Sequence, residues 1–165
     1  MAYFEDLTPY EYCGYFEGIK NVGWLDGKFP QAPQSKEFIE KLREYTQREF
    51  LTSMTRGFHL CPYCQNTEQG RKMGASSSCE IRVVGQNGEV YASPYLILHY
   101  VEEHNYNPPQ EFFEAVMHGP RPGSEKHNQA LKNSKKTYNR EKAEEKLERK
   151  RSQIPTNKFV GLQDT

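Results

Sequence analysis

Two cysteines and two histidines constrain this chain more than any other feature of its sequence. The tetrapeptide Cys61-Pro-Tyr-Cys64 offers two thiols, and His99 and His104 offer two imidazoles five residues apart. Two sulfur and two imidazole donors make a set of four ligands that suits Zn²⁺ and leaves no coordination position for water. Such a closed site stabilises a fold and carries out no reaction itself. The sequence therefore predicts a structural zinc site formed by Cys61, Cys64, His99 and His104.

The segments around these residues predict the parts of a ββα zinc unit. After the CPYC turn and a polar segment over 65–78, expected to be a mobile loop, Glu80–Ser93 has the pattern of a β-hairpin, with Asn87-Gly88 favouring a type I′ turn. Ser93-Pro94 then has the residues of a helix N-cap and first position, and Asn105 suits a left-handed stop. Residues five apart diverge by roughly 140° on an ideal helix, so the last turn must tighten or open to bring both imidazoles to one ion.

Further helices are predicted on both sides of this unit. Apolar residues recur at helical spacing from Ser35, a candidate cap, to Glu49, and again from Gln110 to His118. The first 33 residues are rich in aromatics and glycine and predict short strands and loops, with core packing favoured over an aromatic recognition surface. The fold class is therefore α+β: a zinc knuckle, a β-hairpin and a helix, with flanking helices.

Charge and composition divide the chain into a body and a tail. Residues 1–123 carry 11 Lys+Arg and 16 Asp+Glu, a net −5, whereas residues 124–165 carry 11 Lys+Arg and 6 Asp+Glu, a net +5. We predict a globular domain over 1–119, a Pro/Gly linker over 120–123, and a basic tail over 124–165 that is partly disordered or a solvated helix. Its basic residues are Lys132, Lys135, Lys136, Arg140, Lys142, Lys146, Arg149, Lys150 and Arg151.

Two other residues compete as metal ligands. His59 places an imidazole two residues before Cys61, and Cys79 lies at the start of the hairpin. A free cysteine packs as a small apolar residue and needs no further role. His127 has no evident partner in the sequence.

Three kinds of chemistry compete with a structural zinc as explanations of these residues. CPYC matches the glutaredoxin active-site tetrapeptide, but a redox dithiol of that type sits at a helix N-terminus, and the Gly/Ser-rich segment after Cys64 does not favour a helix. Zinc hydrolases and deaminases need an open coordination position and a motif such as HExxH or HxE with PCxxC, and the chain has neither. The Asp-His pair of histidine-metal nucleases is missing as well. We expect a protein that is not an enzyme.

Location and partners are predicted from composition. The chain has no N-terminal apolar segment and no apolar run long enough to span a membrane, so we expect a cytoplasmic protein with reduced thiols and no membrane partner. The basic tail suits phosphate backbones, which makes a nucleic-acid-associated module the main alternative to a protein-binding one. The helix with the histidines lacks the side chains that read base edges.

Five short segments belong together as a pattern: YFEDLTPY from Tyr3, NVGWL from Asn21, RGFHLCPYC from Arg56, EIRV from Glu80, and HYVEEHNYNPP from His99. Together they resemble an uncharacterised family of small bacterial proteins. The resemblance covers roughly residues 1–117. It implies a metal-site domain of bacterial or phage origin, and it implies no activity.

These observations lead to one functional expectation and two alternatives. We expect a non-enzymatic, zinc-stabilised module that binds another protein and serves regulation, defence or immunity. The first alternative is a nucleic-acid-associated module that uses the basic tail. The second is a thiol redox protein that uses Cys61 and Cys64.

Overall fold

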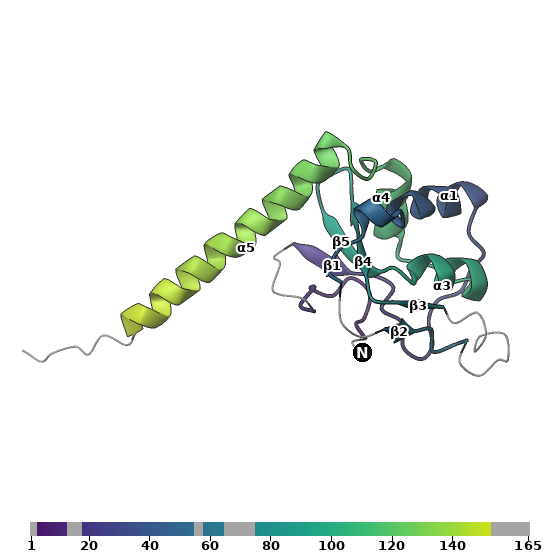
Figure 1. Ribbon diagram of the computed structural model, residues 1–165, viewed down its shortest axis with the longest axis horizontal. Helices are drawn as coiled ribbons and strands as arrows, with labels where there is room; N and C mark the ends of the chain where they lie inside the picture. The colour runs from purple at the N-terminus through teal and green to yellow at the C-terminus, as the bar shows by residue number, and fades with distance from the viewer. Residues whose placement is uncertain (1–2, 13–17, 55–57, 65–74, 153–165) are drawn as a thin grey trace, which may run out of the picture.

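The chain folds into a mixed α+β body from which one long helix projects (Figure 1). The computed structural model describes residues 3–12, 18–54, 58–64 and 75–152. Most of the 65–78 segment, predicted to be a mobile loop, lies outside the described residues, and its last part forms a short strand. None of the helices in the described ranges is both long and apolar enough to cross a membrane.

A three-stranded sheet forms the centre of the body. Its order is β1 (Ile19–Asn21), β5 (Val90–Pro94), β4 (Glu80–Val84), with β1 parallel and β4 antiparallel to β5. The β4–β5 hairpin was predicted, but its type I′ turn was not correct. Within this turn only Gly88 has a positive φ, of 86°, and its N–H donates to the carbonyl of Gly85 over 3.0 Å. A type I turn followed by a left-handed glycine therefore joins the strands.

A second, two-stranded sheet lies beside the first. It pairs β2 (His59–Leu60) with β3 (Ser76–Ser77) in antiparallel register. The CPYC segment directly follows β2, and the N–H of Cys61 donates to the carbonyl of Ala75 over 2.9 Å. The chain thus enters and leaves the cysteine segment through neighbouring strands.

Three helices pack together against the sheet. They are α1 (Lys36–Tyr45), α3 (Ile97–His104) and α4 (Gln110–His118), and a short 3-10 turn over Arg48–Phe50 follows α1. As predicted, Ser35 caps α1, because its hydroxyl accepts the N–H of Phe38 over 3.2 Å. The helix ends at Tyr45, four residues before the predicted Glu49.

The start of α3 differs from the prediction. Strand β5 continues through Pro94, and α3 begins at Ile97 without a side-chain cap. Ser93 is paired with Ile81 across the ladder and is fully buried. Pairing with β4 thus keeps Ser93 in the sheet and prevents it from acting as an N-cap.

Alternating residues of the sheet build two cores. On the first face, Ile81, Val83 and Tyr91 pack with apolar residues of the three helices, including Phe38 of α1 and Phe112 of α4. On the opposite face lies a smaller core formed by Tyr10, Ile19, Trp24, Val84, Val90 and Ala92. Both faces of the sheet are therefore covered.

The long helix α5 (Glu125–Ser152) completes the second core. Ala130 and Leu131 pack against that core, and His127 is only 4% exposed. The tail is thus helical over these 28 residues, and packing continues beyond residue 119, where we expected the body to end. Beyond its first turns α5 extends away from the body (Figure 1).

Candidate metal centre

The structure brings together the four residues that the sequence predicted as zinc ligands. Cys61 and Cys64 come from the segment after β2, and His99 and His104 come from α3. One donor atom from each residue lies within 4.8 Å of the other three. Cys61 is buried, and the other three are partly buried. Two segments remote in sequence therefore meet at one cluster of two sulfurs and two imidazoles.

The distances within this cluster fit a tetrahedral ion. Nε2 of His104 lies 3.3 Å from Sγ of both cysteines, and Nε2 of His99 lies 3.3 Å from Sγ of Cys64 and 3.2 Å from Nε2 of His104. With Zn–S near 2.3 Å and Zn–N near 2.0–2.1 Å, a tetrahedron has S···N edges of about 3.5 Å and an N···N edge of about 3.3 Å. These four separations are within about 0.2 Å of the tetrahedral edges, so the cluster is compatible with a metal site.

The last turn of α3 explains how histidines five apart converge. Asn105 has φ 53° and ψ 33°, the predicted left-handed stop, and its N–H donates to the carbonyl of Tyr100, five residues earlier. The N–H of Tyr106 also donates to that carbonyl, over 3.0 Å. A bond to the fifth preceding residue makes this turn wider than an α-turn. The turn therefore opens, and His104 comes round to the side of His99.

Aromatic residues and a backbone contact hold the ligands in place. The ring of Tyr63, inside the CPYC segment, lies 5.4 Å from that of His104, and its hydroxyl donates to the carbonyl of Gly27 over 3.1 Å. The Phe29 ring lies 4.9 Å from the Tyr63 ring. The side-chain amide of Gln31 donates to the carbonyl of His104 over 3.3 Å. The segment around residues 27–31 thus supports the cluster from outside.

The protonation of the cluster suits metal binding and opposes thiol redox chemistry. Burial lowers the pKa of both His99 and His104, so their imidazoles are neutral at pH 7, the form that binds a metal. Burial and the neighbouring Cys61 raise the pKa of Cys64 to about 11. A reactive redox cysteine needs the opposite shift. A bound cation would offset the cost of deprotonating Cys64, because it takes the place of the thiol proton.

Neither competing ligand belongs to the cluster. Among the described residues, the four-donor group contains only the predicted cysteines and histidines. Nε2 of His59 lies 3.3 Å from the hydroxyl of Tyr100, and the pKa of His59 is lowered by burial. Sγ of Cys79 lies 3.7 Å from the hydroxyl of Ser78. His59 and Cys79 thus occupy other environments.

A second polar cluster was not predicted from the sequence. Glu80 is 2% exposed, and one carboxylate oxygen accepts the hydroxyl of Tyr10 over 2.8 Å and contacts the guanidinium of Arg82 at 2.6 Å. The same guanidinium lies 4.7 Å from the centre of the Tyr10 ring and donates to Ser53 over 3.2 Å. Residues 80 and 82 lie on one face of β4 because side chains alternate along a strand, which is the signal that sequence reasoning could have used.

Fold and site together define a small α+β protein with a Cys₂His₂ cluster that is compatible with a metal site. The chain belongs to the family described as Domain of unknown function (DUF7919), whose family model matches residues 2–117. This confirms the uncharacterised family that the sequence segments predicted. The match contains all four cluster residues and ends before α5. No curated protein and no solved structure matches the chain.

Proposed function

We propose that the protein is a non-enzymatic, zinc-stabilised module that binds another protein. The observation that carries the zinc assignment is the meeting of two sulfurs and two imidazole nitrogens at nearly tetrahedral separations. Thiolate and imidazole are the donors of structural zinc sites, and four of them complete the coordination of Zn²⁺. A closed site without an open position supports a stabilising role for the metal.

An exposed apolar surface next to this site supports protein binding. We call it the His59 patch. Its rings follow one another: Tyr3 lies 5.9 Å and Trp24 6.5 Å from His59, and Tyr12 lies 5.2 Å from Trp24. Large apolar side chains that remain exposed are a mark of interaction sites when they gather in one place. The exposed members are Tyr3 (39%), Tyr12 (37%) and Phe58 (74%), and Tyr12 and Phe58 line one cavity together with His59.

The His59 patch has a cavity that an apolar side chain can enter. Its volume is about 140 Å³, and its lining includes Tyr12, Trp24, Phe58 and His59. Residues 1–123 around it carry 16 Asp+Glu against 11 Lys+Arg, a net −5. The partner we infer is therefore a protein segment that inserts an apolar side chain and carries basic residues beside it. Regulation and defence or immunity are the biological roles we propose for such a module.

Zinc and the His59 patch are joined by the chain itself. His59 of the patch lies in strand β2 (His59–Leu60), and this strand runs directly into the buried Cys61. His59 also bonds to Tyr100, which lies next to His99 on α3. An ion that holds Cys61 and His99 therefore also holds the two elements that position His59, which are strand β2 and the part of α3 that carries Tyr100. We infer that the metal acts by ordering the binding surface.

The test uses the full chain as bait in native lysate and compares wild type, Phe58→Ser and Leu147→Ser. Phe58→Ser removes an exposed ring from the patch, and Leu147→Ser is the matched control, because Leu147 is an exposed apolar residue (50%) on α5. We expect a partner that binds wild type and Leu147→Ser, is lost with Phe58→Ser, and is lost when a chelator removes zinc. Equal recovery with all three proteins, or recovery that survives zinc removal, would contradict the proposal.

A further inference from the structure

Helix α5 is held at one rotational setting by its first turns. Nε2–H of His127 donates to the carbonyl of Arg82 over 3.1 Å, while Nδ1 accepts the N–H of Gly123 over 3.4 Å. Ala130 and Leu131 pack on the second core beside it. These residues lie on one side of the helix and define its body side. Their burial fixes which helix positions face away.

Charge is segregated around the axis of this helix. An α-helix turns about 100° per residue, so each position has a direction relative to His127. The glutamates of the projecting part, at positions 141, 144, 145 and 148, fall within roughly 100° on the body side. The nine basic positions fall within the remaining arc of roughly 200°, with no glutamate of that group among them. They are 132, 135, 136, 140, 142, 146, 149, 150 and 151.

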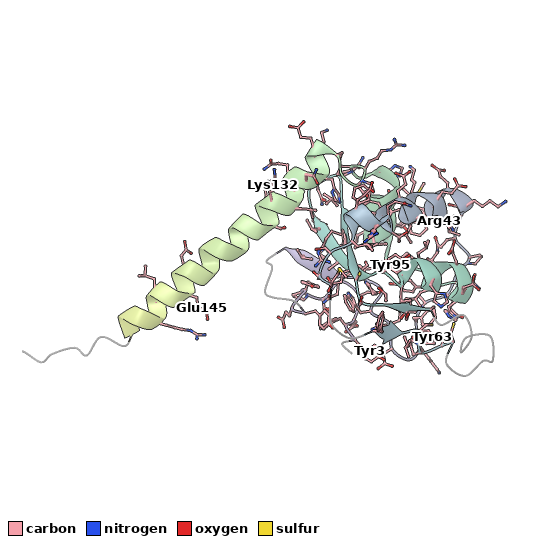
Figure 2. All side chains as sticks on the ribbon, in the orientation of Figure 1. Tyr3, Arg43, Tyr63, Tyr95, Lys132 and Glu145 are labelled. Atoms are coloured by element: carbon pink, nitrogen blue, oxygen red, sulfur yellow. The ribbon has the colours of Figure 1, made fainter. Side chains whose placement is uncertain are left out.

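The described side chains agree with this arrangement. Lys132 is exposed although it directly follows the packed Leu131. Arg149 falls at the border of the two groups, and it forms an ion pair of 2.6 Å with Glu145 across that border. Figure 2 marks Lys132 and Glu145 at the near and far parts of the projecting helix. The sequence alone shows lysine and glutamate interleaved, whereas the continuous helix separates them.

We propose that this basic face of α5 binds the phosphate backbone of a nucleic-acid duplex. From position 132 to position 151 the face is about 29 Å long, at about 1.5 Å per residue, so it can contact phosphates over most of a helical turn of duplex. It carries positive charge and no apolar stripe, whereas a membrane-surface helix needs a wide apolar face. Contacts with phosphates alone give binding that does not depend on base sequence.

Phosphate binding of this kind has a measurable salt dependence. Each neutralised phosphate releases counterions, so the logarithm of affinity falls against the logarithm of salt with a slope of about −0.9 per contact. If six of the nine basic positions reach phosphates, the slope is about −5, and the affinity falls roughly 10³-fold between 50 and 200 mM salt. A solvated helix without a binding role shows no such loss.

The experiment uses the full chain and fluorescently labelled 30-base-pair duplexes of DNA and of RNA. Binding is measured by anisotropy at 50, 100 and 200 mM salt. The test variant Lys136→Glu/Arg140→Glu/Glu144→Lys/Glu148→Lys keeps the net charge but moves two positive charges to the body side. The control variant Lys136→Arg/Arg140→Lys keeps the basic face. Circular dichroism and bound zinc show that each variant retains its fold.

We expect the relocated charges to weaken duplex binding at least tenfold and to make the salt slope shallower by about 2, because two phosphate contacts are lost. The control variant should bind as wild type does. Equal binding by wild type and the relocation variant would overturn the proposal, as would no binding at 50 mM salt. Tighter binding to poly-glutamate than to either duplex would overturn it too, by assigning the face to an acidic protein.

Discussion

Loss of one proposed zinc ligand should lower stability by an amount that can be estimated. Structural zinc binds zinc-finger peptides with about 10–16 kcal/mol near neutral pH. Divided among four ligands, this gives about 3 kcal/mol for each. A chain of this size loses about 2–4 °C in Tm per kcal/mol, so Cys61→Ser and His104→Ala should each lower the Tm by about 6–12 °C. His59→Ala and Cys79→Ser should retain one equivalent of zinc, because neither residue belongs to the cluster.

Elemental analysis and thermal unfolding, each with and without chelator, separate metal loss from other damage. Cys61 is 1% exposed, so Cys61→Ser also places a hydroxyl in the core, whereas His104 is less buried. A chelator should lower the Tm of wild type, His59→Ala and Cys79→Ser more than the Tm of Cys61→Ser and His104→Ala, because three remaining ligands hold zinc less tightly than four. If the chelator destabilises the two ligand variants as much as wild type, the ligand assignment is wrong.

Three further predictions follow from local geometry. Zinc binding should release at least one proton at pH 7.5, because the pKa of Cys64 is raised to about 11. Calorimetry in buffers of different ionisation enthalpy measures the number of protons released. A zinc affinity that stays constant between pH 6.5 and 8.5 would contradict this prediction. Gly119→Ala should lower the free energy of unfolding, measured in urea, by about 3 kcal/mol, because the added Cβ would lie 2.1 Å from the backbone oxygen of Val84. Gly27→Ala is the control and should lower it by only about 1 kcal/mol, because residue 27 has φ 70° but open space around it. A chain ending at residue 119 should unfold at a lower urea concentration than a chain ending at residue 134, because it lacks the α5 residues that cover the second core. Equal urea midpoints for the two chains would show that the folded body ends at residue 119.

The metal cluster could be found from sequence because each half of it is local. CPYC and the two histidines have spacings that suit one ion, and the only three-dimensional requirement is that the two segments meet. The spacing of the histidines predicts that the last turn of α3 either tightens or opens, because five residues do not complete a whole number of helical turns. Its particular form, with two N–H groups donating to the carbonyl of Tyr100, depends on where Tyr106 packs and has no local signal.

Two wrong predictions and one missed strand pairing share a physical cause, which is that tertiary contacts override local sequence signals. Ser93-Pro94 has good helix-start chemistry, but pairing of Ser93 with Ile81 keeps it in the sheet. The parallel pairing of β1 with β5 joins Ile19 to Val90, far along the chain, so no turn motif announces it. His127 appeared to have no partner because that partner is the backbone carbonyl of Arg82, which is invisible to side-chain patterns.

The separation of an acidic body from a basic helix has its own consequence for binding. Charges in water interact strongly only within a Debye length of about 8 Å at physiological salt. The helix runs about 30 Å beyond Leu131, so its far basic positions lie several Debye lengths from the sheet on which it packs. The glutamates of the projecting part also lie on the body side of α5, so the basic positions lie on the rest of the helix circumference. Charge changes in the body should therefore alter partner binding at the His59 patch and leave duplex binding by α5 unchanged, and the two surfaces can be tested independently in one protein.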